Sequence, residues 1–543
     1  MTASLAPPEL EAPALTAEAP TTSDRWSGRV FVAAVVVTLP LLLWVGRDHW
    51  FFLDDWWVLT RDGLTRPGYL DGHNGHWITL LRFEYRLNFE LWGLRSYVPY
   101  QLPVVLAHLG AAVLLRQVIR RCGARGWIAT VVALAFLIFG SGRENMTFGF
   151  QASVTGSLVC GLGLFLLADG PRTVTRRDWL ALGLGVVGLM TSSVFVALLV
   201  GFGVATLLRR GLRVAVFYAL PLGLIYGAWY IRYGADSAVP LGSPAKAARF
   251  VGRMFWAIFD ALAQSAVGAV LVVLAGVGLA AALHQARRSG NWAAAALPLG
   301  LAAAWLTFAS LTALGRADVE LTAESHGAGR YVHVGAVLLL PLVAVGAERL
   351  ARRHTALAVM ALAPLAIGLP GNLDLLYHTD PLFRTRDPVL ALAHSRFIDD
   401  VPPDTRLIEI SEIRVPLTAG WLGHQVAAGR VPEPDDAVDP VVGLDATREL
   451  VLEQRPGTDQ QRRCPPLTGP LATTLHAGGE LRFGGAIRIS TIDGTDESSP
   501  RGFFSGDGST IRALAGPVDI LVRSVEGLPG FVCEPPDPSN DTG

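Results

Sequence analysis

Long apolar runs separated by short polar segments fill the first two thirds of the chain. A membrane-spanning helix needs about 20 mostly apolar residues. Runs of roughly this length without Asp, Glu, Lys or Arg lie at 30–46, 96–115, 126–142, 145–168, 179–208, 214–231, 261–286, 289–315, 331–347 and 354–373. The run 179–208 has polar residues near its middle, at 191–193, so it can form one long helix or two short ones. The pattern therefore predicts an α-helical polytopic membrane protein with ten or eleven spans.

The distribution of basic residues favours eleven spans. With a cytoplasmic N-terminus, eleven spans put 15 arginines in the inner loops and seven basic residues in the short outer loops, whereas ten spans give 13 against nine. Cytoplasmic loops of membrane proteins carry an excess of Lys and Arg. We therefore expect a multi-pass protein of the cell membrane whose C-terminal region lies outside the cytoplasm.

The composition agrees with a membrane protein. The 543 residues are 51% hydrophobic and 17% charged, whereas soluble globular chains carry about 25% charged residues. A soluble multidomain enzyme, a disordered chain and a fibrous protein are thereby excluded. The net charge of -1 gives no reason to expect a nucleic-acid partner.

Three regions follow from the same pattern. Residues 1–28 are rich in Ala, Pro, Thr and Glu, lack the basic start of a signal peptide, and are predicted to be a disordered cytoplasmic tail. Residues 29–373 form the membrane domain. Residues 374–543 are polar and predict a soluble, β-rich or α+β domain. Its expected strands are 406–410, 480–489, 510–513 and 518–525, and its expected helices are 387–398 and 418–428.

The C-terminal region contains two cysteines, Cys464 and Cys533. An extracytoplasmic location would allow them to form a disulfide. The alternative is two unrelated free thiols.

The predicted outer loop 47–95 opens with an acidic pair among aromatic residues, in the sequence WFFLDDWW. Removal from water raises the pKa of a carboxyl group and suits it to act as a base. Asp54 and Asp55 are therefore candidate bases, with a slight preference for Asp55. The alternative is a solvated acidic turn.

The same loop continues with DGHNGHW, which contains His73, Asn74 and His76. Two histidines three residues apart can share a helical face and bind a metal ion, a phosphate or a sugar hydroxyl. The sequence leaves open whether a divalent metal ion takes part. Residues 82–91 alternate between polar and apolar, as in a strand, but an isolated strand would have no partner. We therefore expect a helix along the membrane interface, with Arg86 and Glu90 four residues apart.

Other predicted outer segments are also charged. Charged residues close to the hydrocarbon core are energetically costly and are therefore candidates for function. Arginines suit an anionic ligand because one guanidinium group can bind two oxygens of a phosphate. The alternative is that Arg316 and Arg330 pair with the neighbouring Asp318, Glu320 or Glu324. The candidates from these segments are Arg143, Glu144, Gln151, Arg316, Arg330 and Tyr331.

Together these features resemble the GT-C superfamily of polytopic glycosyltransferases, in particular bacterial members that use polyprenyl-phosphate sugars. The resemblance covers residues 30–372 and rests on four segments. They are DDWW at 54–57, HNGHW at 73–77, ENMTFGFQ at 144–151 and GR…GRY at 315–331. Gly329 departs from the more usual Ser-Arg-Tyr, which leaves the role of this position open. The C-terminal region resembles no family that we can name.

The resemblance implies a GT-C-like fold and a hexosyl or pentosyl transferase. The enzyme would move a sugar from a polyprenyl-phosphate donor to a glycan, lipid or protein acceptor at the outer face of the membrane. Asp55 or Asp54 would be the base, and Arg316 and Arg330, with Arg143, would hold the phosphate. Sugar or acceptor contacts would come from His73, Asn74, His76, Glu144, Gln151 and Tyr331. The alternative is a non-catalytic flippase, polymerase or transporter of lipid-linked glycans.

Overall fold

The computed structural model describes most of the membrane region and parts of the C-terminal region. The described residues are 22–64, 68–235, 242–318, 325–377, 386–394, 403, 409–410, 413–414, 417–433, 452–455, 466–476, 478–491, 503–505, 509–513, 518–524 and 530–533.

The described part of the chain is mostly helical, as predicted. Eight of its helices are long and apolar enough to cross a membrane. They are Thr22–Val45, Val98–Arg121, Gly149–Leu167, Leu212–Gly234, Gly268–Ser289, Trp292–Arg316, Gly329–Ala351 and Thr355–Tyr377. The fold class of a polytopic helical membrane protein is confirmed, while the number of eleven spans and the orientation of the termini stay predictions.

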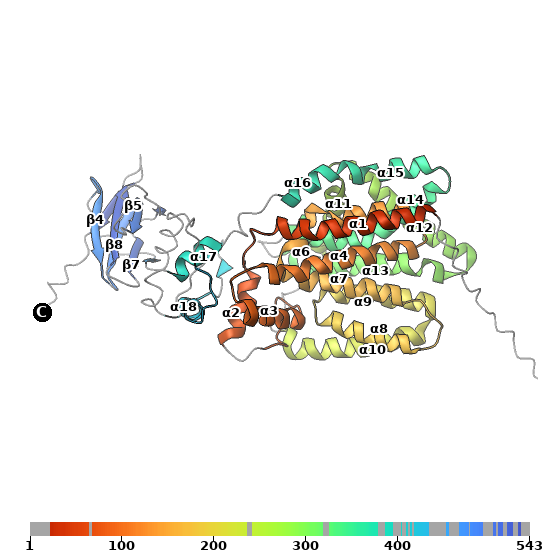
Figure 1. Cartoon of the computed structure of the whole chain (residues 1–543), viewed down its shortest axis with the longest axis horizontal. Helices are drawn as coiled ribbons and strands as arrows, with labels where there is room; N and C mark the ends of the chain where they lie inside the picture. Colours follow the sequence, from red (N-terminus) through yellow and green to blue (C-terminus); the bar gives the residue numbers. More distant parts are fainter. Residues whose placement is uncertain are drawn as a thin grey trace, which may run out of the picture.

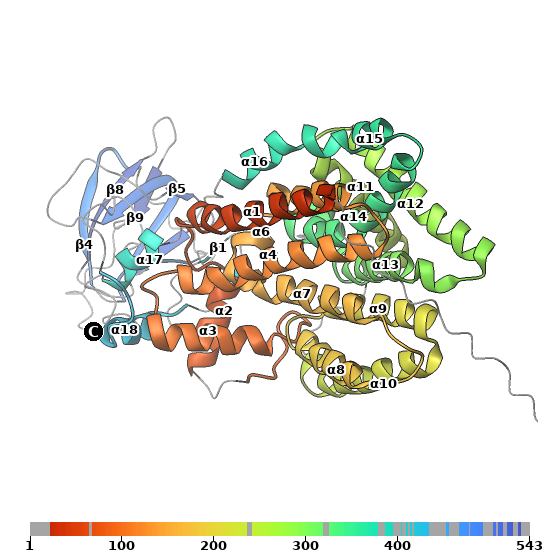
Figure 2. The same cartoon turned by 45° about the vertical axis from the view of Figure 1, so that its right-hand side comes forward.

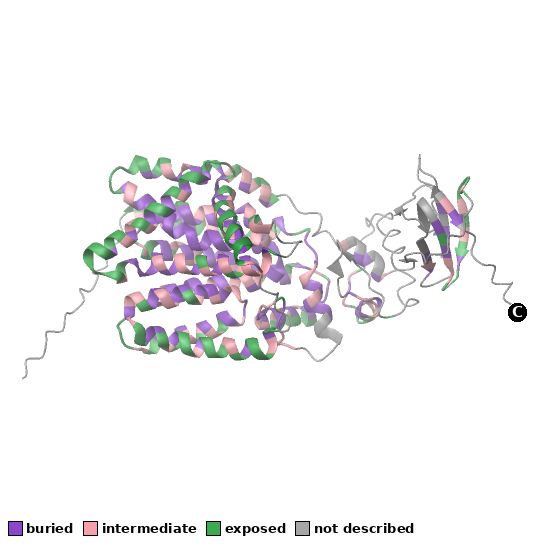
Figure 3. Ribbon diagram, turned by 180° about the vertical axis from the view of Figure 1, so that it is seen from behind, coloured by how far each residue is buried: buried purple, intermediate pink, exposed green. Residues whose placement is uncertain are grey.

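The helices form one bundle with their axes roughly along its length (Figures 1 and 2). Helix α14 (Gly329–Ala351) is buried along nearly its whole length and forms the centre. It contacts α4 (Val98–Arg121), α5 (Gly126–Leu137), α12 (Gly268–Ser289), α13 (Ala296–Arg316) and α15 (Thr355–Ile367). Helix α1 (Thr22–Val45) packs against α4 and α5, α7 (Ala152–Leu167) against α4, and α9 (Val194–Arg210) against α13. Exposed residues lie along the outside of this bundle (Figure 3). They include large apolar side chains such as Val36, Leu180, Leu224 and Ile231. Such a surface suits contact with lipid.

One boundary differs from expectation, and one alternative that the sequence left open is decided. Helix α1 begins at Thr22, inside the segment predicted to be a disordered tail, and residues 1–21 lie outside the described part of the chain. The run 179–208 forms two helices, α8 (Arg176–Leu189) and α9, separated by a turn at 190–193. The hydroxyl groups of Thr191, Ser192 and Ser193 lie in this turn, so the two-helix alternative is correct.

A layer of short helices covers one end of the bundle, which we call the site end (Figure 1). It contains α2 (Asp54–Leu64), α3 (Thr79–Trp92), η1 (Gly140–Gly142), α6 (Glu144–Thr147) and η2 (Gly149–Gln151). The helix predicted over 82–91 is confirmed, with an ion pair of 2.6 Å between Arg86 and Glu90. The amphipathic helix α11 (Pro244–Ala263) packs against α12, α13 and α14, and α16 (Leu369–Tyr377) follows α15.

The C-terminal region is a small α+β unit. Its helices are α17 (Arg386–Ala393) and α18 (Ala419–Ala427). Its strands are β1 (Glu409–Ile410), β2 (Ile413–Arg414), β3 (Leu452–Arg455), β4 (Leu471–Leu475), β5 (Glu480–Thr491), β6 (Phe503–Ser505), β7 (Ser509–Ala513), β8 (Val518–Ser524) and β9 (Gly530–Cys533). The four predicted strands and both predicted helices correspond to β1, β5, β7, β8, α17 and α18.

Strand β5 organises the antiparallel sheet. Its first half pairs with β7 and β9, and its second half pairs with β6 and β8. The change of partners occurs at Gly484 and Gly485, where the strand lacks side chains. Cys533 lies in β9 opposite Arg482, and Cys464 lies outside the described residues. The disulfide between them stays a prediction. Among the described residues, Cys122 and Cys160 are free thiols.

Helix α18 attaches the C-terminal region to the layer at the site end. The indole of Trp421 packs against Trp56 and Phe89, with ring centroids 6.3 and 5.9 Å apart. The guanidinium group of Arg430 forms an ion pair of 2.7 Å with Glu90. Leu94 N donates to the carbonyl oxygen of Arg430 at 2.8 Å. An apolar core with polar contacts at its edge therefore joins the two regions.

Gly93 allows this close contact. It has φ 58°, and a Cβ atom there would lie 2.5 Å from the carbonyl oxygen of Arg430. We expect Gly93→Ala to loosen α18, measured as faster proteolysis of the C-terminal region. Gly123→Ala is the matched control, since Gly123 also has positive φ, 91°, but open space around it. Equal proteolysis rates in the two variants would show that the contact with Arg430 is unimportant.

Candidate functional site

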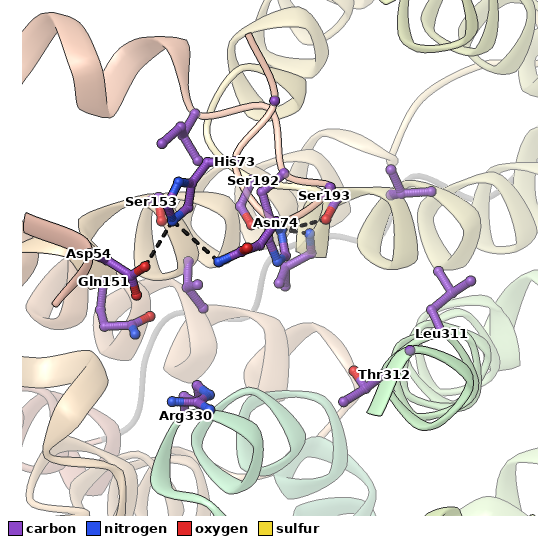
Figure 4. Close-up of a pocket in the computed structure, with 18 of the residues that line it drawn as sticks. Asp54, His73, Asn74, Gln151, Ser153, Ser192, Ser193, Leu311, Thr312 and Arg330 are labelled. Atoms are coloured by element: carbon purple, nitrogen blue, oxygen red, sulfur yellow. Dashed lines mark hydrogen bonds and ion pairs between the residues drawn. The ribbon is translucent and has the colours of Figure 1, made fainter. Parts of the chain in front are cut away.

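A cavity of about 990 Å³ lies at the site end of the bundle (Figure 4). It is lined by the start of α2, the segment 71–78, η2, the turn before α9, and the ends of α10 (Leu212–Trp229), α13 and α14. Eight of the eleven residues predicted for catalysis or ligand binding line it. They are Asp54, His73, Asn74, His76, Gln151, Arg316, Arg330 and Tyr331.

The segment 68–78 is fixed against the end of α10. The Trp229 indole N–H donates to the carbonyl oxygen of Leu70 at 2.7 Å, and the ring of Trp77 stacks on Trp229 at 5.1 Å. Gly72 N donates to the carbonyl oxygen of Tyr233 at 3.1 Å. These contacts hold the two histidines of the segment over the cavity.

His73 and His76 flank a two-residue turn instead of sharing a helical face. Their backbone groups exchange two hydrogen bonds of 3.0 and 2.8 Å, and the turn residues Asn74 and Gly75 have φ values of 49° and 77°. This is the geometry of a tight hairpin, for which Asn-Gly is the favoured sequence. The residues next to such a turn form a facing pair, so both imidazoles reach the cavity. The Asn-Gly signal was available in the sequence, and the helical interpretation of it was wrong.

Two carboxylates line the cavity, Asp54 and Asp71, and Asp54 is the one next to His73. It is the first residue of α2, and His73 Nε2 lies 2.8 Å from its Oδ1 atom (Figure 4). Because a carboxylate can only accept hydrogen bonds, Nε2 is the donor. This bond orients one carboxylate oxygen and leaves the other available to a ligand in the cavity.

His76 contacts the turn between α8 and α9. Its Nδ1 atom is hydrogen-bonded with the hydroxyl groups of Ser192, at 3.0 Å, and Ser193. Burial, with the nearby positive charge of Arg316, lowers the pKa of His76 to about 4. The imidazole is therefore neutral at physiological pH.

Two guanidinium groups line the cavity, Arg316 at the end of α13 and Arg330 at the start of α14. Arg330 donates to Glu144 at 3.0 Å and lies 5.1 Å from the ring of Tyr331. Asp318, which the sequence suggested as an alternative partner, forms an ion pair with Lys246. Glu320 and Glu324 lie outside the described residues.

Gly329, the departure from the more usual motif, lies where another segment passes closely. A Cβ atom at this position would be 2.6 Å from the carbonyl oxygen of Ser141 in η1. A serine would therefore push the start of α14 away from η1. The glycine lets Arg330 and Tyr331 approach the layer of short helices.

Asp55 does not line the cavity, although it was slightly preferred as the base on sequence grounds. Its side chain is fully buried and accepts hydrogen bonds from Phe52 N at 3.0 Å, from the Tyr97 hydroxyl at 3.1 Å and from the Tyr85 hydroxyl. Burial raises the pKa of Asp55 to about 7 despite these bonds. The neighbouring aspartates thus point in different directions, and Asp55 ties α2 to α3 and α4.

Arg143 and Glu144 also lie outside the cavity lining. Arg143 donates to the carbonyl oxygen of Leu375 at 2.9 Å. Glu144 accepts from Gln151 at 3.0 Å and from Arg330, so it connects two residues that do line the cavity. The sequence grouped these residues correctly but did not distinguish those that face the cavity from those that support it.

Several cavity residues were not predicted. Ser192 and Ser193 were noted only as an interruption of a span, Trp57 only as part of the segment DDWW, and the aromatic side chains of Tyr226, Tyr230 and Tyr233 were not singled out. Tyr230 and Tyr233 belong to the π-helical turn η3 (Tyr230–Gly234), and such turns are frequent at functional sites. Among the described residues, no group of three or more His, Cys, Asp and Glu side chains could hold a metal ion.

Glu84 gives the site end a pH-dependent stability. Burial raises its pKa to about 9, and among the described residues its Oε2 atom has no hydrogen-bond partner. Between pH 4.5 and 9 the folded protein therefore holds a proton that the unfolded chain releases, so stability falls as pH rises through this window. We expect Glu84→Gln to raise the melting temperature at pH 8 and to leave it unchanged at pH 4, measured in detergent. An equal shift at both pH values would contradict a titrating Glu84.

Comparisons with known proteins give two similar solved structures. No protein-family model and no curated protein sequence matches the chain. The structure is similar to ArnT from Cupriavidus metallidurans in the apo state, with a TM-score of 0.46 and 12% identity over 92% of this chain and 100% of that chain. It is also similar to ArnT from the same organism bound to undecaprenyl phosphate, with a TM-score of 0.44 and 14% identity over 91% of this chain and 100% of that chain.

Proposed function

We propose that this protein is a membrane glycosyltransferase that moves a sugar from a polyprenyl-phosphate donor to an acceptor hydroxyl or amine. One observation carries the proposal. A single cavity at the end of the bundle brings together a carboxylate, Asp54, and two guanidinium groups, Arg316 and Arg330. A weak nucleophile needs a base, and a phosphate leaving group needs fixed positive charge.

The remainder of the lining suits the two ends of such a donor. Val194, Ala197, Phe308 and Leu311 supply apolar surface for an isoprenoid chain, and they come from helices of the bundle. Trp57 and the tyrosines of η3 offer aromatic faces and hydroxyl groups, which commonly contact sugars and other polar ligands with apolar faces.

In the proposed reaction, Asp54 accepts the proton of the acceptor as its oxygen or nitrogen attacks the anomeric carbon. The bond between that carbon and the phosphate oxygen breaks, and its electron pair leaves with the polyprenyl phosphate. Arg316 and Arg330 stabilise the charge that develops on the phosphate. His73 holds the Asp54 carboxylate in place, and neutral His76 forms a hydrogen bond with a sugar or acceptor oxygen.

The experiment is transfer from radiolabelled polyprenyl-phosphate hexose and pentose donors in membranes that contain the protein. We expect label to enter cell-envelope material and polyprenyl phosphate to be released. Arg330→Ala and Arg316→Ala should weaken donor binding and lower the maximal rate, because phosphate contacts exist in the ground state and the transition state. Arg249→Ala is the matched control, since Arg249 is an exposed arginine of α11 that does not line the cavity.

No transfer from either donor class by the wild-type protein would contradict the proposal. A non-catalytic flippase, polymerase or transporter would then be the better interpretation of the same cavity.

A further inference from the structure

Three polar side chains are buried in a row behind Arg330. They are Asn145 of α6, His333 of α14 and His108 of α4, and each is fully buried. None of them lines the cavity. Polar and ionisable side chains inside a membrane bundle are costly and usually serve a function. His108 lies within one of the apolar runs of the sequence, at 96–115, and its partners could not be read from the sequence.

The hydrogen bonds along the row have one consistent direction. His108 Nε2 lies 3.0 Å from the carbonyl oxygen of Leu137, which can only accept, so Nε2 carries the proton. In a neutral imidazole His108 Nδ1 is then an acceptor, and it faces His333 Nε2 at 3.1 Å. His333 Nδ1 in turn accepts from the Asn145 side-chain amide at 3.3 Å. Both imidazoles are thus neutral, and all four ring nitrogens are satisfied.

The row ends at Arg330. The Asn145 amide group also donates to the backbone carbonyl oxygen of Arg330 at 3.0 Å. Its neighbour Glu144 accepts from the guanidinium group of Arg330 at 3.0 Å. Two consecutive residues of α6 therefore hold Arg330, one at the backbone and one at the charged head.

We infer that His108, His333 and Asn145 are positioning residues for Arg330. The row connects the start of α14 to α4, α5 and α6. It thereby fixes the position of the Arg330 guanidinium group in the cavity. Its importance for donor binding rests on the proposed function, in which Arg330 holds the phosphate. Its effect on the position of Arg330 does not depend on any ligand.

The first experiment measures Arg330 directly. Phenylglyoxal labels accessible guanidinium groups, and mass spectrometry of the full-length protein in nanodiscs gives the labelling rate of each arginine. His333→Leu keeps the volume of the side chain but removes its hydrogen bonds with His108 and Asn145. Because only the bond with Asn145 leads to Arg330, we expect the labelling rate of Arg330 to rise about fivefold, as for the loss of one hydrogen bond. Arg316, which is not part of the row, should keep its rate.

Two further variants make the result decisive. His108→Leu removes the far end of the row without touching α14 and should raise the Arg330 rate in the same direction, which also covers the case in which His333→Leu does not fold. Thr206→Val is the matched control, because Thr206 is a fully buried polar residue of α9 outside the row. Unchanged labelling of Arg330 in the folded variants would overturn the inference.

The second experiment measures binding of undecaprenyl phosphate by the quenching of tryptophan fluorescence in nanodiscs. We expect His333→Leu to weaken binding about fivefold and to have no further effect when Arg330 is already alanine, because it acts through Arg330. An equal loss in both backgrounds would show a general structural effect and overturn the inference. If the wild-type protein bound no undecaprenyl phosphate, the proposed function would fail, while the labelling experiment would still decide whether the row positions Arg330.

Discussion

Asp54→Asn should lower the rate of sugar transfer by about 10²–10⁴-fold, the usual contribution of a general base. An amide cannot accept the proton of the attacking acceptor, whereas its shape preserves contact with His73, which lies 2.8 Å from the carboxylate. Donor binding and membrane insertion should change little. The measurement is single-turnover transfer from a polyprenyl-phosphate sugar, with donor affinity determined separately.

Two other aspartates sharpen the test. Asp48→Asn is the control, since Asp48 is exposed at the same end of the bundle and forms an ion pair of 3.4 Å with Arg47. Asp55→Asn should act differently from Asp54→Asn, because it places an amide N–H group among three hydrogen-bond donors and so lowers the melting temperature of the protein. Wild-type transfer rates in Asp54→Asn would rule out Asp54 as the base.

Asp178→Ala should destabilise the protein by about 3–5 kcal/mol, the cost of leaving a buried charge without its partner. Asp178 and Arg210 are almost completely buried at the end of the bundle opposite the site end, and Arg210 Nη2 lies 2.9 Å from Asp178 Oδ2. Asp178 also accepts hydrogen bonds from Thr175 and from the Tyr218 hydroxyl. Thermal unfolding in detergent, followed by circular dichroism, would measure the loss.

The neighbouring pair provides a matched comparison. Asp169 forms an ion pair of 2.6 Å with Arg209 and a second one with Arg121, and the side chains of Asp169 and Arg209 are about one quarter exposed. Exposed pairs contribute only about 0–1 kcal/mol. Asp169→Ala should therefore change the stability far less than Asp178→Ala. Similar losses in the two variants would contradict the view that burial makes the Asp178–Arg210 pair important.

Periodic patterns in the sequence predicted the elements of the fold well. Apolar length predicted a polytopic helical fold, and the lack of a partner strand favoured a helix around Arg86, which the structure confirms. The strand expected at 480–489 is part of β5. Such signals succeed because each depends on residues close together in the chain.

Directions of side chains could not be predicted in the same way. Neighbouring residues such as Asp54 and Asp55 face opposite environments, and only the contacts with Tyr85 and Tyr97 reveal which one is buried. Glu144 contacts Arg330 at the start of α14, and His333 contacts Asn145 of α6. Each contact joins residues almost 190 positions apart in the chain. Sequence spacing carries no information on such contacts, so the cavity and its supporting residues required the structure.

The packing of Trp421 on Trp56 has a consequence for the order in which the protein is made. Trp56 lies two residues after Asp54 and is fully buried, and Trp421 of α18 packs against its ring. During synthesis the membrane helices emerge before α18, so the loop that carries Asp54 cannot complete its apolar core until residue 431 has left the ribosome. A chain stopped before residue 417 would contain the eight candidate membrane spans but not α18. The ring of Trp56, close to the Asp54 carboxylate, would then still be exposed to water.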